Sequence, residues 1–275
     1  MLYGEYSILL SVYGQEQPAF FRKALKSILE QTLLPRQVVL VEDGYLPERL
    51  IKVIDDFIAK AEFEITIVKL EKTYDLGQAL DKGLKKCSCE IVARADSDDL
   101  NLFTRMEGQY KYLQAHQNVA VVGAYIQEFY EANGVTKKLE IRKVPLEAVA
   151  IGRFSKRRNP LNHMSVMFRK SVISKCGGYV KMLHFEDYFL WLRVLAKGYQ
   201  IVNLPKVMVL ARTGKNFYTK RTGWKYFREE FNFQRKILAE HFIGPTIFLG
   251  NFFTRVIVRL CPPKIMKFVY KALRN

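Results

Sequence analysis

Short apolar segments alternate with amphipathic ones through the first 130 residues, and this alternation constrains the fold more than any other feature. The apolar segments read as buried strands and cover residues 7–13, 38–41, 65–68, 91–95 and 119–130. The amphipathic segments read as helices. The first helix begins at Pro18, and the others cover residues 47–60, 77–86 and 102–115. Strands that are apolar on both faces and alternate with helices indicate a mostly parallel sheet flanked by helices. The sequence therefore predicts an α/β fold.

The pattern is less regular from about residue 131 onward. It predicts a short strand through Phe168, a helix that ends near Cys176 and a further helix around Trp191. From about residue 222 the chain is helical, aromatic and basic. We therefore divide it into a main domain over residues 1–221 and a basic amphipathic helical tail over residues 222–275.

An acidic cluster, Asp96-Ser97-Asp98-Asp99, follows the strand predicted at residues 91–95. In an open parallel sheet, ligands bind beyond the carboxyl ends of the strands. Neighbouring carboxylates repel one another unless a cation neutralises them, and Asp96 and Asp98 are spaced to share one hard divalent ion such as Mn²⁺ or Mg²⁺. Alternatively, Asp98 or Asp99 caps the following helix, which accounts for one aspartate but not for three.

The second predicted strand ends in another acidic pair, Glu42-Asp43, followed by Gly44. A carboxylate at this position can accept a hydrogen bond from a nucleobase or a ribose hydroxyl, although Asp-Gly is also a common turn pair. The chain has neither a GxGxxG segment after its first strand nor a GxxxxGK[ST] loop. Their absence argues against a dinucleotide-dependent enzyme and against a P-loop enzyme.

Six segments occur in the order typical of the inverting nucleotide-sugar transferases of glycosyltransferase family 2, which the chain resembles over residues 6–215. They are the opening strand 7–13, Val39-Leu-Val-Glu-Asp43-Gly44, Leu76-Gly77 to Gly83, Arg94-Ala-Asp96-Ser-Asp98-Asp99, Asn162-His163 with the turn Gly177-Gly178-Tyr179, and Phe185-Glu186-Asp187 to Trp191 and Arg193. The resemblance implies a GT-A fold, with a nucleotide-binding half in residues 1–100 and an acceptor half in residues 101–221. Within the family, the chain is most similar to bacterial capsule, exopolysaccharide and lipopolysaccharide enzymes.

The same resemblance implies a role for each site residue. It assigns nucleotide-sugar binding to Tyr13, Glu16, Asp43, Gly77, Arg94 and Asp96. It assigns metal binding to Asp96 and Asp98, and acceptor binding to His163 and Trp191. Asp187 is the implied catalytic base, with Glu186 as the second candidate. A bound Mn²⁺ or Mg²⁺ neutralises the leaving diphosphate, and the base accepts the proton of the attacking acceptor hydroxyl.

Alternative interpretations remain open for several of these residues. Glu186 and Asp187 also suit the first turn of a helix, where the helix dipole favours negative charge. A lone histidine such as His163 is often structural, and Trp191 has the helical spacing of a core residue. The QxxRW segment of processive polymerases is absent after Trp191, which indicates transfer of a single sugar.

Charge is distributed unevenly along the chain. Residues 1–211 carry 30 basic and 24 acidic side chains, whereas residues 212–275 carry 14 and 3. The basic set includes Arg212, Lys215 and Arg221, which either close over the diphosphate or belong to a solvated loop. The tail combines its charge with apolar residues, as do helices that lie on anionic lipid. It can also pack on the main domain or on a second subunit. We expect no nucleic-acid partner, because such a ligand explains neither the apolar content nor the acidic cluster.

The sequence contains no apolar segment of the roughly 18 residues that a membrane span requires, and its start lacks the features of a signal peptide. We therefore expect a cytoplasmic enzyme, peripheral on the inner face of the cell membrane. Its expected reaction is the inverting transfer of one hexose or N-acetylhexosamine from a UDP-sugar to a lipid-linked saccharide. The alternative is a catalytically silent protein of the same fold that binds nucleotide-sugars or membrane. The sugar, the acceptor, the linkage and the oligomeric state stay open.

Overall fold

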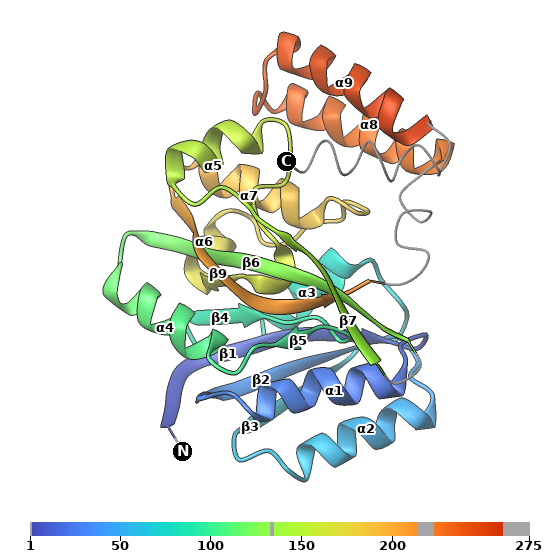
Figure 1. Cartoon of the computed structure of the whole chain (residues 1–275), viewed down its shortest axis with the longest axis vertical. Helices are drawn as coiled ribbons and strands as arrows, with labels where there is room; N and C mark the ends of the chain where they lie inside the picture. Colours follow the sequence, from blue (N-terminus) through green and yellow to red (C-terminus); the bar gives the residue numbers. More distant parts are fainter. Residues whose placement is uncertain (1, 133–134, 214–222, 261–275) are drawn as a thin grey trace.

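The computed structural model describes residues 2–132, 135–213 and 223–260. Within these ranges nine strands form one sheet, in the order β3-β2-β1-β4-β8-β6-β9-β5, with β7 paired to β6 (Figure 1). The strands are β1 (Leu2–Tyr13), β2 (Leu33–Asp43), β3 (Glu64–Lys69), β4 (Ile91–Arg94), β5 (Leu100–Asn101), β6 (Val119–Ala132), β7 (Val135–Arg142), β8 (Met167–Arg169) and β9 (Gln200–Arg212). The helices are α1 (Pro18–Leu29), α2 (Glu48–Ile58), α3 (Leu76–Leu84), α4 (Arg105–Ala115), α5 (Ala148–Ser155), the 3₁₀ turn η1 (His163–Ser165), α6 (Lys170–Lys175), α7 (Glu186–Ala196), α8 (Trp224–Ala239) and α9 (Pro245–Leu260).

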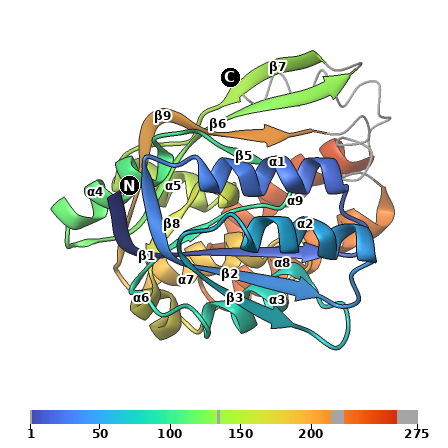
Figure 2. The same cartoon turned by 90° about the horizontal axis from the view of Figure 1, so that it is seen from below.

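The amino-terminal half of the sheet is parallel, which confirms the predicted α/β class. β1 pairs in parallel with β2 and β4, and β2 pairs in parallel with β3. Successive side chains point to opposite faces, so Ile8 and Leu10 pack under α1 and α2, whereas Leu9 and Val41 pack with α3 (Figure 2). Because both faces bury apolar side chains, these strands read as continuous apolar runs in the sequence.

The other half of the sheet contains strands that the sequence pattern did not predict. β9 pairs in parallel with β6 along most of its length, and β7 pairs with β6 in the antiparallel direction. Pro205 and Lys206 interrupt the apolar pattern of β9, and they fall where its register with β6 shifts. The helix predicted from residue 102 begins at Arg105, because residues 100–101 form β5 and pair with β9.

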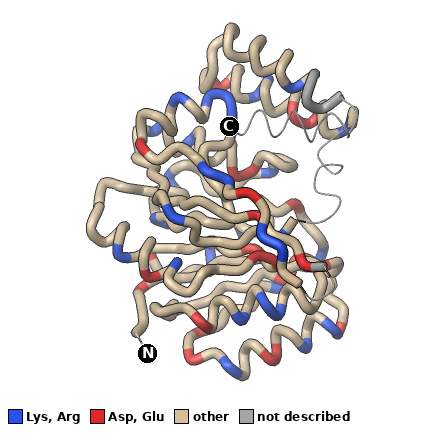
Figure 3. Tube along the Cα trace, in the orientation of Figure 1, with Lys and Arg blue, Asp and Glu red and all other residues tan. Residues whose placement is uncertain are grey.

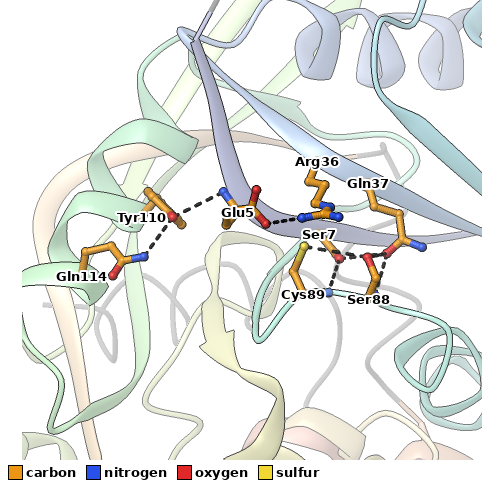
Figure 4. Close-up of polar contacts among 8 residues, drawn as sticks. All are labelled: Glu5, Ser7, Arg36, Gln37, Ser88, Cys89, Tyr110 and Gln114. Atoms are coloured by element: carbon orange, nitrogen blue, oxygen red, sulfur yellow. Dashed lines mark hydrogen bonds and ion pairs between the residues drawn. The ribbon is translucent and has the colours of Figure 1, made fainter.

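Polar side chains hold the parallel strands together at the amino-terminal edge of the sheet, opposite the carboxyl ends of the strands. Gln37 Oε1 accepts hydrogen bonds from Ser7 Oγ at 2.9 Å and from the Ser88 N–H at 2.8 Å, and Arg36 pairs with Glu5 at 2.7 Å (Figure 4). A cavity of about 490 Å³ opens at this edge. Its charged groups already have partners within the protein: Glu5 pairs with Arg36, Glu90 accepts from Ser171 Oγ, and Arg169 donates to backbone carbonyl oxygens. They therefore hold the strands in place.

The described part of the tail, residues 223–260, packs on the main domain, one of the arrangements that the sequence left open. Helix α8 covers α7 through a shared apolar cluster, in which the rings of Phe185 and Phe233 stack at 4.7 Å. Helix α9 packs on α8, where Arg255 pairs with Glu230 at 2.9 Å. Among the described residues, no helix is long and apolar enough to cross a membrane.

Candidate active site

A cleft of about 660 Å³ opens at the carboxyl ends of β1, β2 and β4. This is the edge at which open parallel sheets bind ligands. Its walls include Tyr13, Glu16, Phe20, Asp43, Tyr74, Leu76, Asp96, Ser97, Asp98, Glu131 and Arg212. The fold thus gathers into one cleft most of the residues that the sequence assigned to nucleotide and metal binding.

The acidic turn after β4 concentrates negative charge in this cleft. Burial raises the pKa of Asp98 to about 7, with further contributions from the charges of Asp96 and Glu16. Burial and the charge of Asp96 also hold the pKa of Asp99 well above its usual range, although Asp99 accepts a hydrogen bond from the Arg212 N–H at 2.7 Å. A cation beside Asp98 would relieve this repulsion.

The donor set fits a divalent cation that takes part of its coordination from the substrate. Within the described ranges, no three His, Cys, Asp or Glu side chains converge to hold a metal on their own. Asp98 offers a carboxylate at the cleft, and Asp96 offers a second that is ion-paired with Arg94 Nη1. The remaining positions that Mn²⁺ or Mg²⁺ needs are then open to diphosphate oxygens and water.

A buried arginine on α4 supports the strand that carries the acidic turn. Arg105 is fully buried, and its Nη2 donates to the carbonyl oxygens of Arg94 at 2.7 Å and Val166 at 3.2 Å. Its Nε donates to Gln109 Oε1 at 3.0 Å. Sequence reasoning missed this pair. The available signal was that Arg105 and Gln109 lie on the same helical stripe as the core residue Leu113.

Glu16 holds the acidic turn from the other side. Its Oε2 accepts from Ser97 Oγ at 2.7 Å and its Oε1 from the Gln17 N–H at 2.7 Å. Both carboxylate oxygens are therefore engaged by the protein, and Glu16 joins the loop after β1 to the acidic turn. Tyr13, at the end of β1, is 44% exposed and faces the same cleft.

Arg212, the last residue of β9, closes the cleft opposite β1. Its Nε donates to the Asp98 carbonyl oxygen at 3.0 Å, and its guanidinium lies 3.9 Å from the ring centroid of Phe20 and pairs with Glu131 at 3.1 Å. Arg212 is thus held in place rather than solvated, and its buried Nη2 has no hydrogen-bond partner among the described residues. Lys215 and Arg221, which the sequence grouped with it, lie outside these residues.

Asp43, at the end of β2, forms the far wall of the cleft. Its Oδ1 accepts from the Tyr74 N–H at 2.8 Å; burial raises its pKa while this hydrogen bond lowers it. Gly44 follows with φ of +79°, and a Cβ there would lie 2.5 Å from Thr73 Oγ1, so the turn requires glycine. The adjacent Glu42 lies 3.9 Å from the Lys69 ammonium and is not among the residues that line the cleft.

The two candidate bases occupy the first turn of α7, in different environments. Asp187 is buried, and it accepts hydrogen bonds from Asn159 Nδ2 at 2.5 Å and from the Tyr188 N–H at 2.7 Å. Burial raises the pKa of Asp187, and these two bonds oppose the rise. Burial and the charge of Asp187 raise the pKa of Glu186 to about 8. Asn159 is a further residue that sequence reasoning missed.

Gly77 joins the base-bearing helix to the cleft. A Cβ at Gly77 would lie 2.9 Å from the Glu186 Cβ and 2.8 Å from the Val180 carbonyl oxygen, so only glycine lets α3 begin this close to α7. The preceding residue, Leu76, lines the cleft. Gly77 therefore acts through packing, by placing Glu186 next to the wall of the cleft.

The two residues assigned to the acceptor are buried beneath the site. His163 Nε2 lies 2.9 Å from the Tyr179 hydroxyl, and burial lowers its pKa well below the usual range. Trp191 is completely buried and presents no surface on which a sugar can stack. Trp191 is therefore a core residue, which was the alternative interpretation of its helical spacing. A structural role likewise fits His163.

Comparison with known sequences gives a family and close relatives. The family model described as "Glycosyl transferase family 2" matches residues 7–176. The chain is 38% identical to the "Amylovoran biosynthesis glycosyltransferase AmsE" of Erwinia amylovora, covering 98% of this chain and 99% of that protein. It is 35% identical to the "UDP-Gal:alpha-D-GlcNAc-diphosphoundecaprenol beta-1,3-galactosyltransferase" of Escherichia coli, covering 97% and 95%.

Solved structures agree in fold. TarS (residues 1–349) of S. aureus, in complex with UDP-GlcNAc, matches 94% of this chain and 74% of its own, with a TM-score of 0.67. The mannosyltransferase PcManGT of Pyrobaculum calidifontis, in complex with GDP-Man and Mn²⁺, matches 98% and 74% with a TM-score of 0.65. Both are 16% identical to this chain, so the likeness concerns the GT-A fold.

Proposed function

The chain belongs to glycosyltransferase family 2 and is a glycosyltransferase, and on this basis we propose that it transfers one hexose or N-acetylhexosamine from a UDP-sugar to a lipid-linked saccharide. The transfer inverts the anomeric centre and serves the synthesis of a cell-surface polysaccharide. The observation that carries the proposal is the single cleft that contains both Asp43 and the acidic turn. The E. coli relative, whose name gives a UDP-Gal donor and a diphosphoundecaprenol acceptor, supports this choice of substrates.

The nucleotide lies between β2 and the acidic turn in this proposal. Asp43 keeps Oδ1 on the Tyr74 N–H, which leaves its other oxygen to accept from an N–H of the uracil ring. Tyr13 is exposed along the same wall. Asp96, held by Arg94, is positioned for the ribose or the diphosphate.

The diphosphate meets the acidic turn. A Mn²⁺ or Mg²⁺ held by Asp98, with Asp96, would act as a Lewis acid that neutralises the charge of the leaving UDP. Arg212 closes the same side of the cleft, and its Nη2, which has no partner in the described part of the chain, is a donor for a phosphate oxygen. Glu16 and Arg105 keep the turn in place through the hydrogen bonds described above.

Asp187 accepts the proton of the acceptor hydroxyl as it attacks the sugar. Its two hydrogen bonds fix the carboxylate and oppose the effect of burial on its pKa, as a general base at neutral pH requires. Glu186 remains the second candidate, because its raised pKa of about 8 leaves it mostly protonated at neutral pH. If the donor sugar is α-linked, inversion gives a β-linkage.

A donor screen tests the proposal. The full-length chain is incubated with Mn²⁺, a lipid-linked acceptor fraction and one of several UDP- or GDP-sugars, and the released nucleoside diphosphate is measured. We expect UDP release that depends on acceptor and metal. Asp98→Asn should abolish it, whereas Asp56→Asn on the exposed face of α2 should not. Release of GDP but not UDP would contradict the proposed donor, and full activity in chelator would contradict the metal.

A further inference from the structure

The α8–α9 hairpin has one side that packs on the protein and another that faces outward. The packed side of α8 places Tyr226, Phe233 and Ile237 against α7. The outward side of α8 carries the exposed basic residues Lys225, Arg228 and Arg235. Lys236 is also exposed, but its ammonium lies over the Phe189 ring of α7 and pairs with Glu240. Helix α9 is the outermost element of this part of the molecule (Figure 1).

The outward side of α9 is uncharged. Its exposed residues up to position 254 are Pro245, Thr246, Leu249, Gly250, Phe253 and Thr254, and the helix is tan over most of its length in Figure 3. Leu249 is 52% exposed and Phe253 62%, and Trp224 at the start of α8 is 68% exposed. Large apolar side chains exposed close together mark an interaction surface.

Ring contacts place Trp224 and Phe253 at the same end of the hairpin, and Leu249 lies one turn before Phe253 on α9. Trp224 contacts Phe227 at 5.4 Å, Phe227 contacts Phe252 at 6.1 Å, and Phe252 contacts Phe253 at 5.5 Å. The series runs from the first turn of α8 to α9. Arg228 follows Trp224 by one helical turn, so basic and apolar side chains are neighbours on this surface.

The charge of this surface selects its partner. Arg228 and Arg235 are exposed two helical turns apart on α8, and Arg228 lies one turn from Trp224. A second copy of the chain on the same face would bring these arginines against each other, which is unfavourable. Exposed apolar side chains beside cations are typical of helices that lie in the interface of an anionic bilayer.

We propose that this outward surface, made up of Trp224, Arg228, Arg235, Leu249 and Phe253, docks the enzyme on an anionic lipid membrane. The apolar side chains enter the headgroup region and the arginines contact lipid phosphates. The inference rests on the proposed function in one respect, since a lipid-linked acceptor requires the enzyme to work at a membrane. Because α8 also packs on α7, the docked hairpin holds the helix that bears Asp187 near the lipid surface.

Co-sedimentation of the full-length chain with vesicles tests the surface. Wild type should bind phosphatidylglycerol-containing vesicles more strongly than pure phosphatidylcholine vesicles, and less strongly at high salt. Arg228→Gln with Arg235→Gln should lower the partition coefficient about fivefold per residue. Leu249→Ser with Phe253→Ser should lower it at least tenfold, also at high salt.

Matched controls lie on α2 and in the turn that follows it, at the far end of the molecule (Figure 1). Lys52→Gln with Lys60→Gln removes the same charge from exposed positions, and Ile58→Ser alters a side chain that is 44% exposed. Both controls should bind vesicles as wild type does, and all variants should keep the wild-type melting temperature and UDP affinity measured without vesicles.

Three results would overturn the docking surface. The first is equal binding of wild type to both vesicle types, and the second is an equal loss of vesicle binding in the α2 controls. The third is a stable dimer of the wild type that the double variant Leu249→Ser with Phe253→Ser converts to monomer, with vesicle binding unchanged. Loss of UDP-sugar turnover with vesicle binding intact would instead refute the proposed reaction and leave the docking surface standing.

Discussion

Asn159→Ala removes a hydrogen-bond donor from the candidate base, together with the 3.2 Å hydrogen bond that Asn159 Oδ1 accepts from the Leu161 N–H. Asn159 Nδ2 donates to Asp187 Oδ2 at 2.5 Å, and this bond lowers the pKa of Asp187 against the effect of burial. A hydrogen bond to a charged group contributes about 1.5–3 kcal/mol, and about 1.4 kcal/mol corresponds to one pH unit. Removing the donor destabilises the carboxylate and not the carboxylic acid, so the pKa of Asp187 rises.

The expected result is a displaced pH profile. The rise of kcat/KM with pH should move up by about one to two pH units, because Asp187 is then protonated over a wider range. Well below the midpoint the rate should fall about tenfold per unit of displacement, while the high-pH plateau changes little. UDP affinity should stay constant, because Asn159 is not among the residues that line the nucleotide cleft.

The assay is acceptor-dependent UDP release between pH 5 and 9, with donor Kd measured separately. Asn118→Ala is the matched control, because it removes an exposed asparagine that donates to Gln200 at 2.8 Å. An unchanged midpoint in Asn159→Ala would refute Asp187 as the base. If Glu186→Gln then lowers kcat by about 10²–10⁴ while Asp187→Asn does not, the role belongs to Glu186.

Three further changes test the acidic turn, its support and the tail. The folded-state pKa of Asp98, about 7, lies above the value of about 4 expected when unfolded, so stability from this group is present at low pH and lost as pH rises through 7. Metal-free Asp98→Asn should therefore show a flatter decline of melting temperature between pH 5 and 8 than wild type, and equal slopes would contradict the repulsion. Arg105→Leu removes a donor from the buried Arg94 carbonyl oxygen and from buried Gln109 Oε1, while the Val166 carbonyl oxygen keeps the Arg94 N–H at 2.9 Å. It should cost about 2–5 kcal/mol of unfolding free energy in urea, and a loss below about 1 kcal/mol would count against this supporting role. Phe233→Ala, at a fully buried position, should cost about 3–5 kcal/mol in the same assay, and a near-neutral effect would mean that α8 does not depend on α7.

The sequence determined the parallel half of the fold and the position of the acidic turn. Strands buried on both faces are continuously apolar, so β1, β2 and β4 can be recognised as apolar runs in the sequence without any knowledge of their neighbours. Their carboxyl ends meet at one edge of the sheet, which is why Asp43 and Asp98 line one cleft although far apart in the chain.

Only the tertiary structure decided which polar side chains support that cleft and which lie beneath it. Asn159 reaches Asp187 across 28 positions and Arg105 reaches Val166 across 61, and no local pattern encodes either pairing. Trp191 has the same helical spacing whether it faces a sugar or the core. Packing also decided the course of β9 and the covering of α7 by α8, because periodicity reports that a face is apolar and not which element buries it.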